Sequence, residues 1–587
     1  MKILGISCFY HDAAAALLVD GEIVAAAQEE RFSRKKHDDS FPAHSIEYCL
    51  SSQKLSIGDI DYVVFYDKPV LKFERLLMTF IKVWPRGLRL FVTAMRVWLK
   101  EKLWVEHTIA KRLEYKGDIL FTEHHYAHAA SAYYASPFLD ATVVTMDGVG
   151  EWDTATVGYA RGNELKLTHT IHFPDSLGML YSAVTYYLGF KVNSAEYKVM
   201  GLAPYGNPNR YYEHFKKLID VKANGSFRLD MRYFAYEYGL TMTNTKFDAL
   251  FGGQPRTPES ELTERHKDIA ASLQKITEEI VLKIVTHAKK LHPSENLCMA
   301  GGVALNAVAN GKILASGVFK NIYIQPAAGD AGCALGAACY VYFDVLGHKK
   351  EGSAMKSAYL GPSFSNDEIK DFLGEAGREY PGFRYSVFSD SDLSSHVAKF
   401  LSENQVVGWF QGRMEFGPRA LGNRSILADP RKKENWQRVN LKIKFRESFR
   451  PFAPSVLAER AGEYFDLHGA ESSYMLLVAP VRMKSIPAVT HVDGSARIQT
   501  LRREDNERFY DLISEFEKLT GCSVLVNTSF NVRGEPIVCT PKEALRVFAN
   551  TDMDVLVLGN FLIVKSENPM LNIKVNQELY LKEFQID

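Results

Sequence analysis

The sequence is short of the features that mark several protein classes. Its 587 residues carry no net formal charge, because 70 lysine and arginine residues balance 70 aspartate and glutamate residues. No overall field therefore favours nucleic acid or a strongly acidic partner. The seven cysteines are odd in number and form no CxxC pair, which argues against a disulfide framework and indicates a reducing compartment.

Long apolar runs are missing as well. The stretch closest to a membrane span, residues 88–105, is interrupted by five charged side chains, so we expect no spanning helix. The amino terminus enters a strand-like pattern without the basic and apolar regions of a signal peptide, which predicts a cytoplasmic protein. A chain of this length exceeds what one hydrophobic core organises, so we expect two or more domains.

The first half of the chain contains an apparent internal duplication. Residues 2–7 are predicted as a strand, followed by an acidic loop and a strand hairpin over residues 13–28. The same order recurs over residues 141–170, with the acidic glycine loop at 147–150. Two such halves resemble the duplicated actin-like, sugar-kinase and Hsp70 ATPase fold, in which they clamp a nucleotide.

A basic and aromatic segment, residues 68–116, separates the two halves. It holds twelve lysine and arginine residues against four glutamates, with three tryptophans among them. We expect a helical insertion whose apolar face packs on the main domain. A helix that docks on a membrane surface or on a partner protein is the alternative.

Two βα units precede the predicted domain boundary. They comprise a strand at 296–299 with a helix at 303–314, and a strand at 321–325 with a helix at 331–343. The polar stretch 348–357 then separates an N-terminal domain, residues 1–350, from a C-terminal domain, residues 360–587. Further alternating elements, including one strand at 554–564, predict that the second domain is also α/β.

A histidine pair is the most informative motif. On a helix, His124 and His128 are one turn apart and project from the same face. Asp147 ends a predicted strand, and Asp330 lies in a Gly-Asp-Ala-Gly loop. Two imidazoles and two carboxylates suit a divalent metal such as iron, manganese or zinc. With phosphate oxygens completing the shell, such an ion would neutralise charge on a triphosphate.

Glycine turns and a polar pair accompany these residues. The turns at Gly301-Gly302 and at residues 329–332 each precede a predicted helix, where backbone N–H groups suit phosphate oxygens. Ordinary tight βα turns are the alternative. His11 and Asp12 close the first strand, where this fold class places polar catalytic groups. Residues 29–37, rich in both charge signs, read on their own as a solvated charge run.

The second domain places arginines among glycine, proline and aromatic residues. They occur in the stretches 416–425, 444–454 and 497–500, and an Asn-Thr-Ser motif follows at 527–529. Several arginines around one pocket suit a small phosphorylated or carboxylated ligand, because guanidinium binds such groups bidentately. A nucleic-acid surface is the alternative, which the neutral overall charge disfavours.

Nine motifs, in order along almost the whole chain, resemble those of the O-carbamoyltransferases of the NodU/CmcH/TobZ type, which make nodulation factors and carbamoylated antibiotics. The motifs are SCFYHDAA, EERFSRKKHD, HHYAHAASA, EYKVMGLAPYG, GGVALNAVAN, GDAGCALGAA, FGPRALGNRSI, FRPFAP and NTSFNVRGEPI.

The resemblance implies a fold and a reaction. It implies an actin-like ATPase domain followed by a YrdC-like α/β domain that binds carbamoyl phosphate and removes its phosphate. The carbamate would then move through the protein to ATP in the first domain and form carbamoyl adenylate and pyrophosphate. A hydroxyl of a small-molecule acceptor would attack that anhydride and release AMP.

The resemblance also implies roles for individual residues. A divalent metal, expected to be Fe2+, would be held by His124, His128, Asp147 and Asp330. His11, Asp12 and Lys36 would lie near the adenylate, although the adjacent Lys35 is open for the same role, and His11 is our hypothesis for the base. The residues implied to bind the nucleotide are Gly301, Gly302, Asn306, Gly329 and Asp330. The residues implied to bind carbamoyl phosphate are Arg419, Arg424, Lys444, Arg450, Arg497, Asn527 and Ser529.

Two alternatives compete with this interpretation. One is a tRNA threonylcarbamoyladenosine-type enzyme, for which only the basic insertion 68–116 offers a surface; we expect no nucleic acid partner. The other is a non-catalytic ATPase-fold scaffold in a biosynthetic cluster, which has no need for the arginines, the histidine pair and the acidic loops together. The sequence leaves the acceptor, the metal and a homodimer open.

Overall fold

The chain divides into two compact units. A computed structural model describes residues 1–100, 102–571 and 577–584. The first unit comprises Met1–Glu29 and His37–Lys356, and the second comprises Glu30–Lys36 and Ser357–Asp587. Segment 30–36 therefore packs with the second unit, although its sequence neighbours on both sides belong to the first. Glu101 of the predicted insertion, and 572–576 and 585–587 of the predicted second domain, lie outside the described residues.

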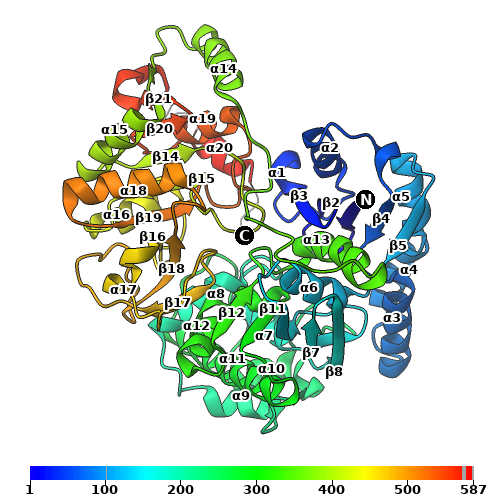
Figure 1. Ribbon diagram of the computed structural model, residues 1–587. Helices are drawn as coiled ribbons and strands as arrows, with labels where there is room; N and C mark the ends of the chain where they lie inside the picture. The colour runs from blue at the N-terminus through cyan, green and yellow to red at the C-terminus, as the bar shows by residue number, and fades with distance from the viewer. Residues whose placement is uncertain (101, 572–576, 585–587) are drawn as a thin grey trace. The chain divides into compact units, whose positions relative to one another are not determined.

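Two five-stranded sheets with the same strand order form the core of the first unit (Figure 1). The orders are β3-β2-β1-β4-β5 and β8-β7-β6-β11-β12. In the first sheet, β1, β2 and β3 pair antiparallel, and β1, β4 and β5 pair parallel. In the second sheet, β6, β7 and β8 pair antiparallel, and β6, β11 and β12 pair parallel. The predicted duplication is confirmed, and this arrangement is the one expected of an actin-like ATPase domain. The strands are β1 Lys2–Ser7, β2 Ala14–Val19, β3 Glu22–Gln28, β4 Tyr62–Phe65, β5 Asp118–Phe121, β6 Asp140–Met146, β7 Asp153–Arg161, β8 Glu164–His172, β11 Asn296–Ala300 and β12 Asn321–Ile324.

Helices cover these sheets, and a short hairpin of β9 (Ile219–Val221) and β10 (Phe227–Leu229) lies apart from them. Both β1 and β2 are buried along nearly their whole length, because helices pack on the sheet they share. The helices of the first unit are α2 Ala43–Ser52, α3 Pro69–Val83, α4 Leu88–Lys100, α5 Val105–Leu113, α6 His124–Tyr133, α7 Leu177–Tyr187, α8 Glu196–Leu202, α9 Tyr212–Leu218, α10 Thr245–Phe251, α11 Glu264–Leu291, α12 Ala307–Ser316 and α13 Asp330–Tyr340.

Helix α13 makes the closest contacts of the first unit. A Cβ at Gly336 of α13 would lie 1.8 Å from the carbonyl oxygen of Ala127 in α6. On its other side, a Cβ at Gly5 of β1 would lie 1.8 Å from the carbonyl oxygen of Ala334 in α13. Only glycine permits backbones to approach this closely. The two glycines therefore set the spacing between β1, α13 and α6.

The predicted helices of the two βα units differ in detail. The predicted helix 303–314 is wrong at its start, where a 3₁₀ turn, Gly302–Leu305, precedes α12. Asn306 begins α12, because its side chain accepts a hydrogen bond from the backbone N–H of Ala309. The predicted helix 331–343 is α13 followed by a π-helical turn, Val341–Val345. The predicted insertion 68–116 is helical and consists mainly of α3, α4 and α5.

The second unit is built on one mixed sheet of nine strands, in the order β13-β21-β20-β14-β15-β19-β16-β18-β17. The single strand predicted over 554–564 is wrong, because β20 and β21 form a hairpin whose turn needs the positive φ of Gly559. The strands are β13 Ser386–Val387, β14 Val407–Phe410, β15 Arg424–Ala428, β16 Ala453–Leu457, β17 Leu477–Pro480, β18 Ser495–Leu501, β19 Val524–Ser529, β20 Val555–Leu558 and β21 Phe561–Val564.

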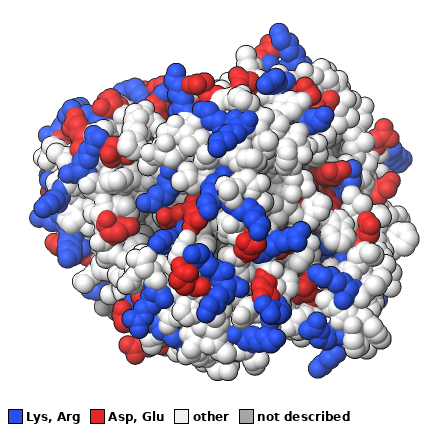
Figure 2. All heavy atoms as spheres, turned by 90° about the horizontal axis from the view of Figure 1, so that it is seen from below, with Lys and Arg blue, Asp and Glu red and all other residues white. Residues whose placement is uncertain are grey.

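The second unit's helices include the short α1, which belongs to segment 30–36. They are α1 Glu30–Ser33, α14 Asn366–Glu379, α15 Asp390–Ser402, α16 Glu434–Arg438, α17 Ala461–Tyr464, α18 Glu507–Thr520, α19 Pro541–Ala549 and α20 Gln577–Lys582. Acidic and basic side chains mix over the face shown in Figure 2, as the balanced composition predicts.

We predict that Gly336→Ala destabilises the first unit. The new methyl group would collide with the Ala127 carbonyl and push α6 away from α13. The expected loss is about 1–3 kcal/mol in the free energy of unfolding, measured by denaturant unfolding followed by circular dichroism. Gly374→Ala in α14 is the matched control, because a Cβ there meets nothing within 4 Å. That change should stabilise its helix by about 0.5–1 kcal/mol. Equal stability of Gly336→Ala and the wild type would contradict the packing described.

Candidate metal centre and anion site

Helix α6 presents the histidine pair as predicted. Its first residue is His124, whose backbone N–H donates to both carboxylate oxygens of Glu151 at 3.1 Å. His128 follows one turn later, and both imidazoles are buried. Their Nε2 atoms lie 3.1 Å apart, and the ring planes are nearly perpendicular. The two nitrogens therefore converge on one point.

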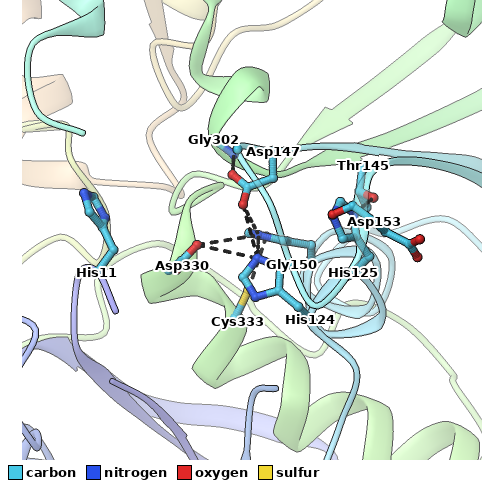
Figure 3. Close-up of polar contacts among 12 residues, drawn as sticks. His11, His124, His125, Thr145, Asp147, Gly150, Asp153, Gly302, Asp330 and Cys333 are labelled. Atoms are coloured by element: carbon cyan, nitrogen blue, oxygen red, sulfur yellow. Dashed lines mark hydrogen bonds and ion pairs between the residues drawn. The ribbon is translucent and has the colours of Figure 1, made fainter. Parts of the chain in front are cut away.

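Two carboxylates from different elements converge on the same point (Figure 3). Asp147 follows the end of β6, and its Oδ2 lies 3.2 Å from His124 Nε2 and 3.9 Å from His128 Nε2. Asp330 is the first residue of α13, and its Oδ1 lies 3.7 and 3.8 Å from the same two nitrogens. The structure thus brings together all four predicted metal ligands.

The donor set fits a divalent metal ion. Bonds of about 2.0–2.2 Å from one ion to nitrogen and oxygen ligands place neighbouring donor atoms roughly 3–3.5 Å apart, close to the observed spacing. Four acceptor-bearing groups facing one another in a buried site require a shared cation or shared protons. Two imidazoles with two carboxylates suit iron, manganese or zinc.

Burial and charge prepare these groups to bind a cation. Burial lowers the pKa of His124 well below its ordinary value, so its imidazole is neutral and able to donate a lone pair. Burial, followed by the nearby charge of Asp147, raises the pKa of Asp330 to about 6. Burial opposes ionisation of Asp147 too, but hydrogen bonds with His124 and His128 hold its pKa well below the ordinary value.

Neighbouring groups orient the metal ligands. The backbone N–H of Gly302 donates to Asp147 Oδ1 at 2.8 Å and so turns Oδ2 toward the histidines. Cys333 Sγ lies 3.2 Å from His128 Nδ1, on the far side of the ring from the metal position. Sequence reasoning missed Cys333 and Glu151. Cys333 follows Asp330 by three residues on α13, a helical spacing that indicates a shared face.

The third histidine of the motif points away from the metal centre. His125 Nδ1 lies 2.6 Å from Thr145 Oγ1, and its Nε2 lies 2.9 Å from the carbonyl oxygen of Asp153. Burial lowers the pKa of His125 to about 3, so the ring is neutral and bridges α6 to β6 and β7. Its role is structural.

The residues predicted to bind a nucleotide include glycines at backbone turns and Asn306, whose side chain contacts other groups of the protein. Gly301 needs its positive φ, and a Cβ there would lie 2.2 Å from the Met146 carbonyl oxygen. A Cβ at Gly329, before α13, would meet nothing within 4 Å, which leaves this helix start open to a ligand. The side chain of Asn306 is instead engaged by Gln274 and by the N–H of Ala309. These contacts argue against the predicted ligand role of Asn306.

His11 and Asp12 belong to a hydrogen-bonded group of three side chains. His11 Nδ1 lies 2.8 Å from Asp12 Oδ2, and His11 Nε2 lies 2.7 Å from the carbonyl oxygen of Asn193. His37 Nδ1 lies 2.7 Å from Asp12 Oδ1. Both partners of His11 are acceptors, so both of its nitrogens carry protons. Sequence reasoning missed His37, although it follows the predicted Lys36 directly.

The charge of His11 conflicts with its predicted role as a base. Burial opposes protonation, but the charge and hydrogen bond of Asp12, the charge of Asp330 and the Asn193 carbonyl together raise the pKa of His11 to about 10. A protonated imidazole has no lone pair to accept a proton. The geometry therefore favours a cationic His11, which lies on the Asp330 side of the cluster in Figure 3.

An arginine cluster in the second unit surrounds Arg497 of β18. Burial lowers the pKa of Arg497 well below its ordinary value, and the charges of Arg419, Arg446 and Arg450 lower it further. Arg450 lies 3.6 Å from Glu447, which is also 3.5 Å from Arg533. Crowded guanidiniums repel one another unless an anion joins them. The structure thus gathers three of the predicted carbamoyl phosphate ligands, Arg419, Arg450 and Arg497.

Three other predicted ligands are engaged inside the protein. Lys444 Nζ donates to the carbonyl oxygens of Ser529 and Asn531 at 2.7 and 2.8 Å, and to Ser529 Oγ at 3.2 Å. It therefore orders the turn that follows Ser529, the last residue of β19. Asn527 Nδ2 donates to Ser455 Oγ and Gln499 Oε1 at 3.0 Å in the buried sheet.

Arg424 has the contacts of a structural residue. It is fully buried, and its guanidinium donates to four backbone carbonyls, those of Gln411, Gly412, Asn423 and Pro362. It also stacks 3.7 Å above the ring of Phe410. These contacts argue against the predicted ligand role of Arg424.

Segment 30–36 is not the solvated charge run that its composition indicates. Glu30 and Arg31 are buried and pair at 2.8 Å, and Arg31 donates to the Gly417 carbonyl. Arg34 pairs with Glu535 at 3.2 Å and donates to two carbonyls beside it. Burial, followed by the charges of Arg446 and Arg450, lowers the pKa of Lys444, and the charge of Lys36 adds a smaller contribution, whereas Lys35 is exposed. Lys36 therefore belongs with the second unit's cationic cluster.

These features define an α/β protein with a candidate metal centre on the duplicated sheets of one unit and an arginine cluster on the mixed sheet of the other. Family models identify the class. Residues 2–339 match the carbamoyltransferase N-terminus, and residues 398–565 match the carbamoyltransferase C-terminus. The chain belongs to the carbamoyltransferase family of enzymes.

Relatives agree with this assignment. The chain is 53% identical over 620 residues to an uncharacterized protein of Synechocystis sp., covering 100% of each chain. It is 39% identical over 570 residues to the nodulation protein NolNO of Sinorhizobium fredii, covering 95% of this chain and 79% of that protein. Component A of the Acidaminococcus fermentans (R)-2-hydroxyglutaryl-CoA dehydratase is 15% identical, with a TM-score of 0.33 over 58% of this chain and 98% of that one. This last likeness is too low to support an inference.

We predict that His124→Asn and His128→Asn abolish stoichiometric metal binding. Each change removes one of four converging donors and should lower the affinity for Fe2+ or Mn2+ by more than about 100-fold. Cys333→Ala removes only the contact to His128 Nδ1, on the far side of the ring, and should lower the metal affinity about tenfold. Elemental analysis of the purified protein measures its metal content. Titration of reduced protein with Fe2+ or Mn2+, after a chelator has removed its metal, measures the affinity. His169→Asn, on the exposed part of β8, is the control. Full metal content in either ligand variant would contradict the assigned centre.

We also predict that His11 remains protonated well above pH 7. Histidine NMR should show a resonance with a pKa near 10 that His11→Gln removes. Because folding raises this pKa from 6.5, its stabilising contribution is complete below pH 6.5 and is lost as the pH rises through about 10. Asp12→Asn should lower this pKa markedly, because it removes the charge and the hydrogen bond of Asp12, while burial still opposes protonation and only the charge of Asp330 and the Asn193 carbonyl still favour it. A His11 that titrates near 6.5 in the wild type would restore the base hypothesis.

Proposed function

We propose that this enzyme is an ATP-dependent O-carbamoyltransferase that uses carbamoyl phosphate and acts on a hydroxyl of a small molecule. In the second unit, water converts carbamoyl phosphate to carbamate and inorganic phosphate. In the first unit, carbamate attacks the α-phosphorus of ATP and releases pyrophosphate. The acceptor hydroxyl then attacks the carbamoyl carbon, the bond to AMP breaks, and the hydroxyl proton is lost to solvent or a base.

The observation that carries this proposal is the presence of a cationic cluster in one unit and a metal centre in the other. A transfer enzyme with a single active site needs one anion-binding site. A candidate anion site in one unit and a candidate metal centre in the other, in units that match the two halves of the carbamoyltransferase family, support two chemical steps with a shared intermediate. The acceptor is a separate question, because nothing in these two sites selects it.

The second unit's arginines suit the first step. Arg419, Arg450 and Arg497 would bind the phosphate of carbamoyl phosphate and stabilise the phosphate that leaves. Lys444 and Lys36 would add positive charge at the same site, with Lys444 acting mainly through the turn that it orders. Glu447 offsets part of the repulsion among these cations, and a bound dianion would offset more of it, which favours binding of a small dianion.

The first unit's groups suit the second step. His124, His128, Asp147 and Asp330 would hold a divalent ion, which supplies Lewis-acid stabilisation of phosphate oxygens. The Gly302 N–H keeps Asp147 aimed at that ion, and the open start of α13 at Gly329 offers backbone N–H groups to a phosphate. The cationic His11 would add positive charge beside the adenylate, with Asp12 and His37 holding its orientation.

The proposal predicts that the two steps can be separated by mutation. Purified enzyme receives ATP, carbamoyl phosphate and a panel of hydroxylated acceptors, and AMP, pyrophosphate and phosphate are quantified. His124→Asn should retain phosphate release but lose AMP and pyrophosphate formation by more than about 100-fold. Arg419→Gln should raise the KM for carbamoyl phosphate by about 10–100-fold, because one charge-assisted pair is lost.

Rescue by carbamate makes this experiment sharper. Added ammonium carbamate should restore AMP formation in Arg419→Gln but not in His124→Asn, because only the former lacks the carbamate supply. Arg378→Gln, an exposed change on α14, is the matched arginine control. Formation of ADP alone would indicate a kinase, and absence of turnover in metal-replete enzyme would indicate a scaffold.

A further inference from the structure

Exposed apolar side chains concentrate on one part of the first unit. They lie on α3, on α4 and on the turns that flank α4, which Figure 1 shows at the margin of that unit. We call this region, residues 69–100 and 102–104, the hairpin surface. Its large exposed apolar residues are Val70, Leu77, Met78, Ile81, Trp84, Leu88, Val92, Val97, Leu99 and Trp104.

Helix α3 carries a continuous apolar stripe. Val70, Leu77, Met78 and Ile81 are spaced so that they fall on one helix face, and their exposed fractions run from 37% to 68%. Glu74 is the acidic residue of that face. The opposite face packs on the unit through buried groups such as Lys72, which pairs with the buried Asp67. An ordinary surface helix reverses this pattern and exposes polar residues.

Helix α4 adds basic residues beside its own apolar stripe. Leu88, Val92 and Leu99 are exposed along one line, and the exposed Arg89, Arg96 and Lys100 follow a parallel line at helical spacing. Among the described residues, no carboxylate pairs with these three basic side chains. The helix therefore presents apolar and positively charged groups together.

The hairpin surface is fixed to the body of the unit. Phe80 of α3 stacks on Phe91 of α4 with ring centroids 3.9 Å apart, and Lys82 pairs with Glu237 at 2.9 Å. Arg75 donates to the Gly150 carbonyl in the loop that follows Asp147. Because this hydrogen bond joins α3 to the loop that follows Asp147, a partner that binds the hairpin surface is held at a fixed position relative to the metal centre.

We propose that the hairpin surface docks the enzyme on an anionic membrane surface. Its exposed aliphatic side chains would enter the boundary between headgroups and acyl chains, with Trp84 and Trp104 at the same level. Arg89, Arg96 and Lys100 would pair with lipid phosphates. None of the helices in the described parts of the chain is long and apolar enough to cross a bilayer, so the contact is interfacial. This docking is independent of the proposed chemistry.

Charge distinguishes a membrane from a second copy of the chain. A two-fold contact through the same surface would bring Arg89, Arg96 and Lys100 of one copy against those of the other. Such like charges repel, and among the described residues of α3 and α4 Glu74 is the one acidic side chain that could offset them. An anionic lipid surface complements the same residues without this repulsion, and its phosphates are laterally mobile.

Vesicle flotation tests the proposal with the full-length protein. Vesicles of phosphatidylcholine alone are compared with an equal mixture of phosphatidylcholine and phosphatidylglycerol, at low and high salt. We expect binding only to the anionic vesicles, and weaker binding at high salt because the Debye length shortens. Failure of the wild type to float with anionic vesicles at low salt would overturn the proposal.

Two sets of variants separate the apolar and electrostatic contributions. Arg89→Gln, Arg96→Gln and Lys100→Gln combined should weaken binding on the order of 100-fold, about fivefold for each basic residue. Leu77→Ser with Ile81→Ser should weaken it by about tenfold or more. The matched controls are Lys312→Gln with Lys370→Gln, and Leu519→Ser, all at exposed positions elsewhere.

The remaining outcomes also decide the proposal. If the controls weaken binding as much as the hairpin variants do, the contact is not made by this surface. If the wild type forms a concentration-dependent dimer that Leu77→Ser with Ile81→Ser abolishes, the apolar stripe serves self-association instead. Unchanged thermal unfolding of each variant ensures that lost flotation reports lost contact with the membrane.

Discussion

The close packing of helix α13 between strand β1 and helix α6 is the constraint on which the first unit depends. Neither contact leaves space for a Cβ, so Gly5 and Gly336 fix the distance between three elements. That distance places the histidines of α6 opposite Asp330 and Cys333 of α13, within a few ångströms of one another. Asp147 joins them from the second sheet, held by the N–H of Gly302. A metal centre with ligands from three elements needs this precision, because a shift of one ångström would separate its donor atoms.

The two units handle buried charge in different ways. In the first unit, a neutral His124 faces carboxylates and a cationic His11 lies close by, so the site has donors suited to a cation. In the second unit, guanidiniums crowd around Arg497, and each further positive charge adds to their mutual repulsion. Binding of a small anion relieves that repulsion. Each unit thus has a buried site whose charge suits a ligand of the opposite sign, as the proposed two-step reaction requires.

Much of the fold and of the metal centre follows from local sequence pattern. Strand hairpins with glycine turns reveal the duplication, and histidines four residues apart on an alanine-rich helix predict a shared ligand face. Prediction fails where long-range packing overrides local pattern. Segment 30–36 resembles a solvated charge run, yet Arg31 and Arg34 are held by groups near residues 417 and 535, hundreds of positions away. Arg424 and Asn306 lie in motifs that suggest ligands, yet their polar atoms are engaged by the protein itself.

The sequence by itself determined which chemical groups the protein has and how they are spaced along each element. It determined the duplicated strand order, the balanced charge, the histidine pair and the arginine-rich second domain, because these depend on periodicity and residue type. Only the tertiary structure decided which of these groups meet. It separated His125 from its two neighbours, gave His11 two acceptors and hence a positive charge, and assigned Lys36 to the second unit. Such outcomes depend on contacts between residues far apart in the chain, and burial among those contacts sets the charge of each group.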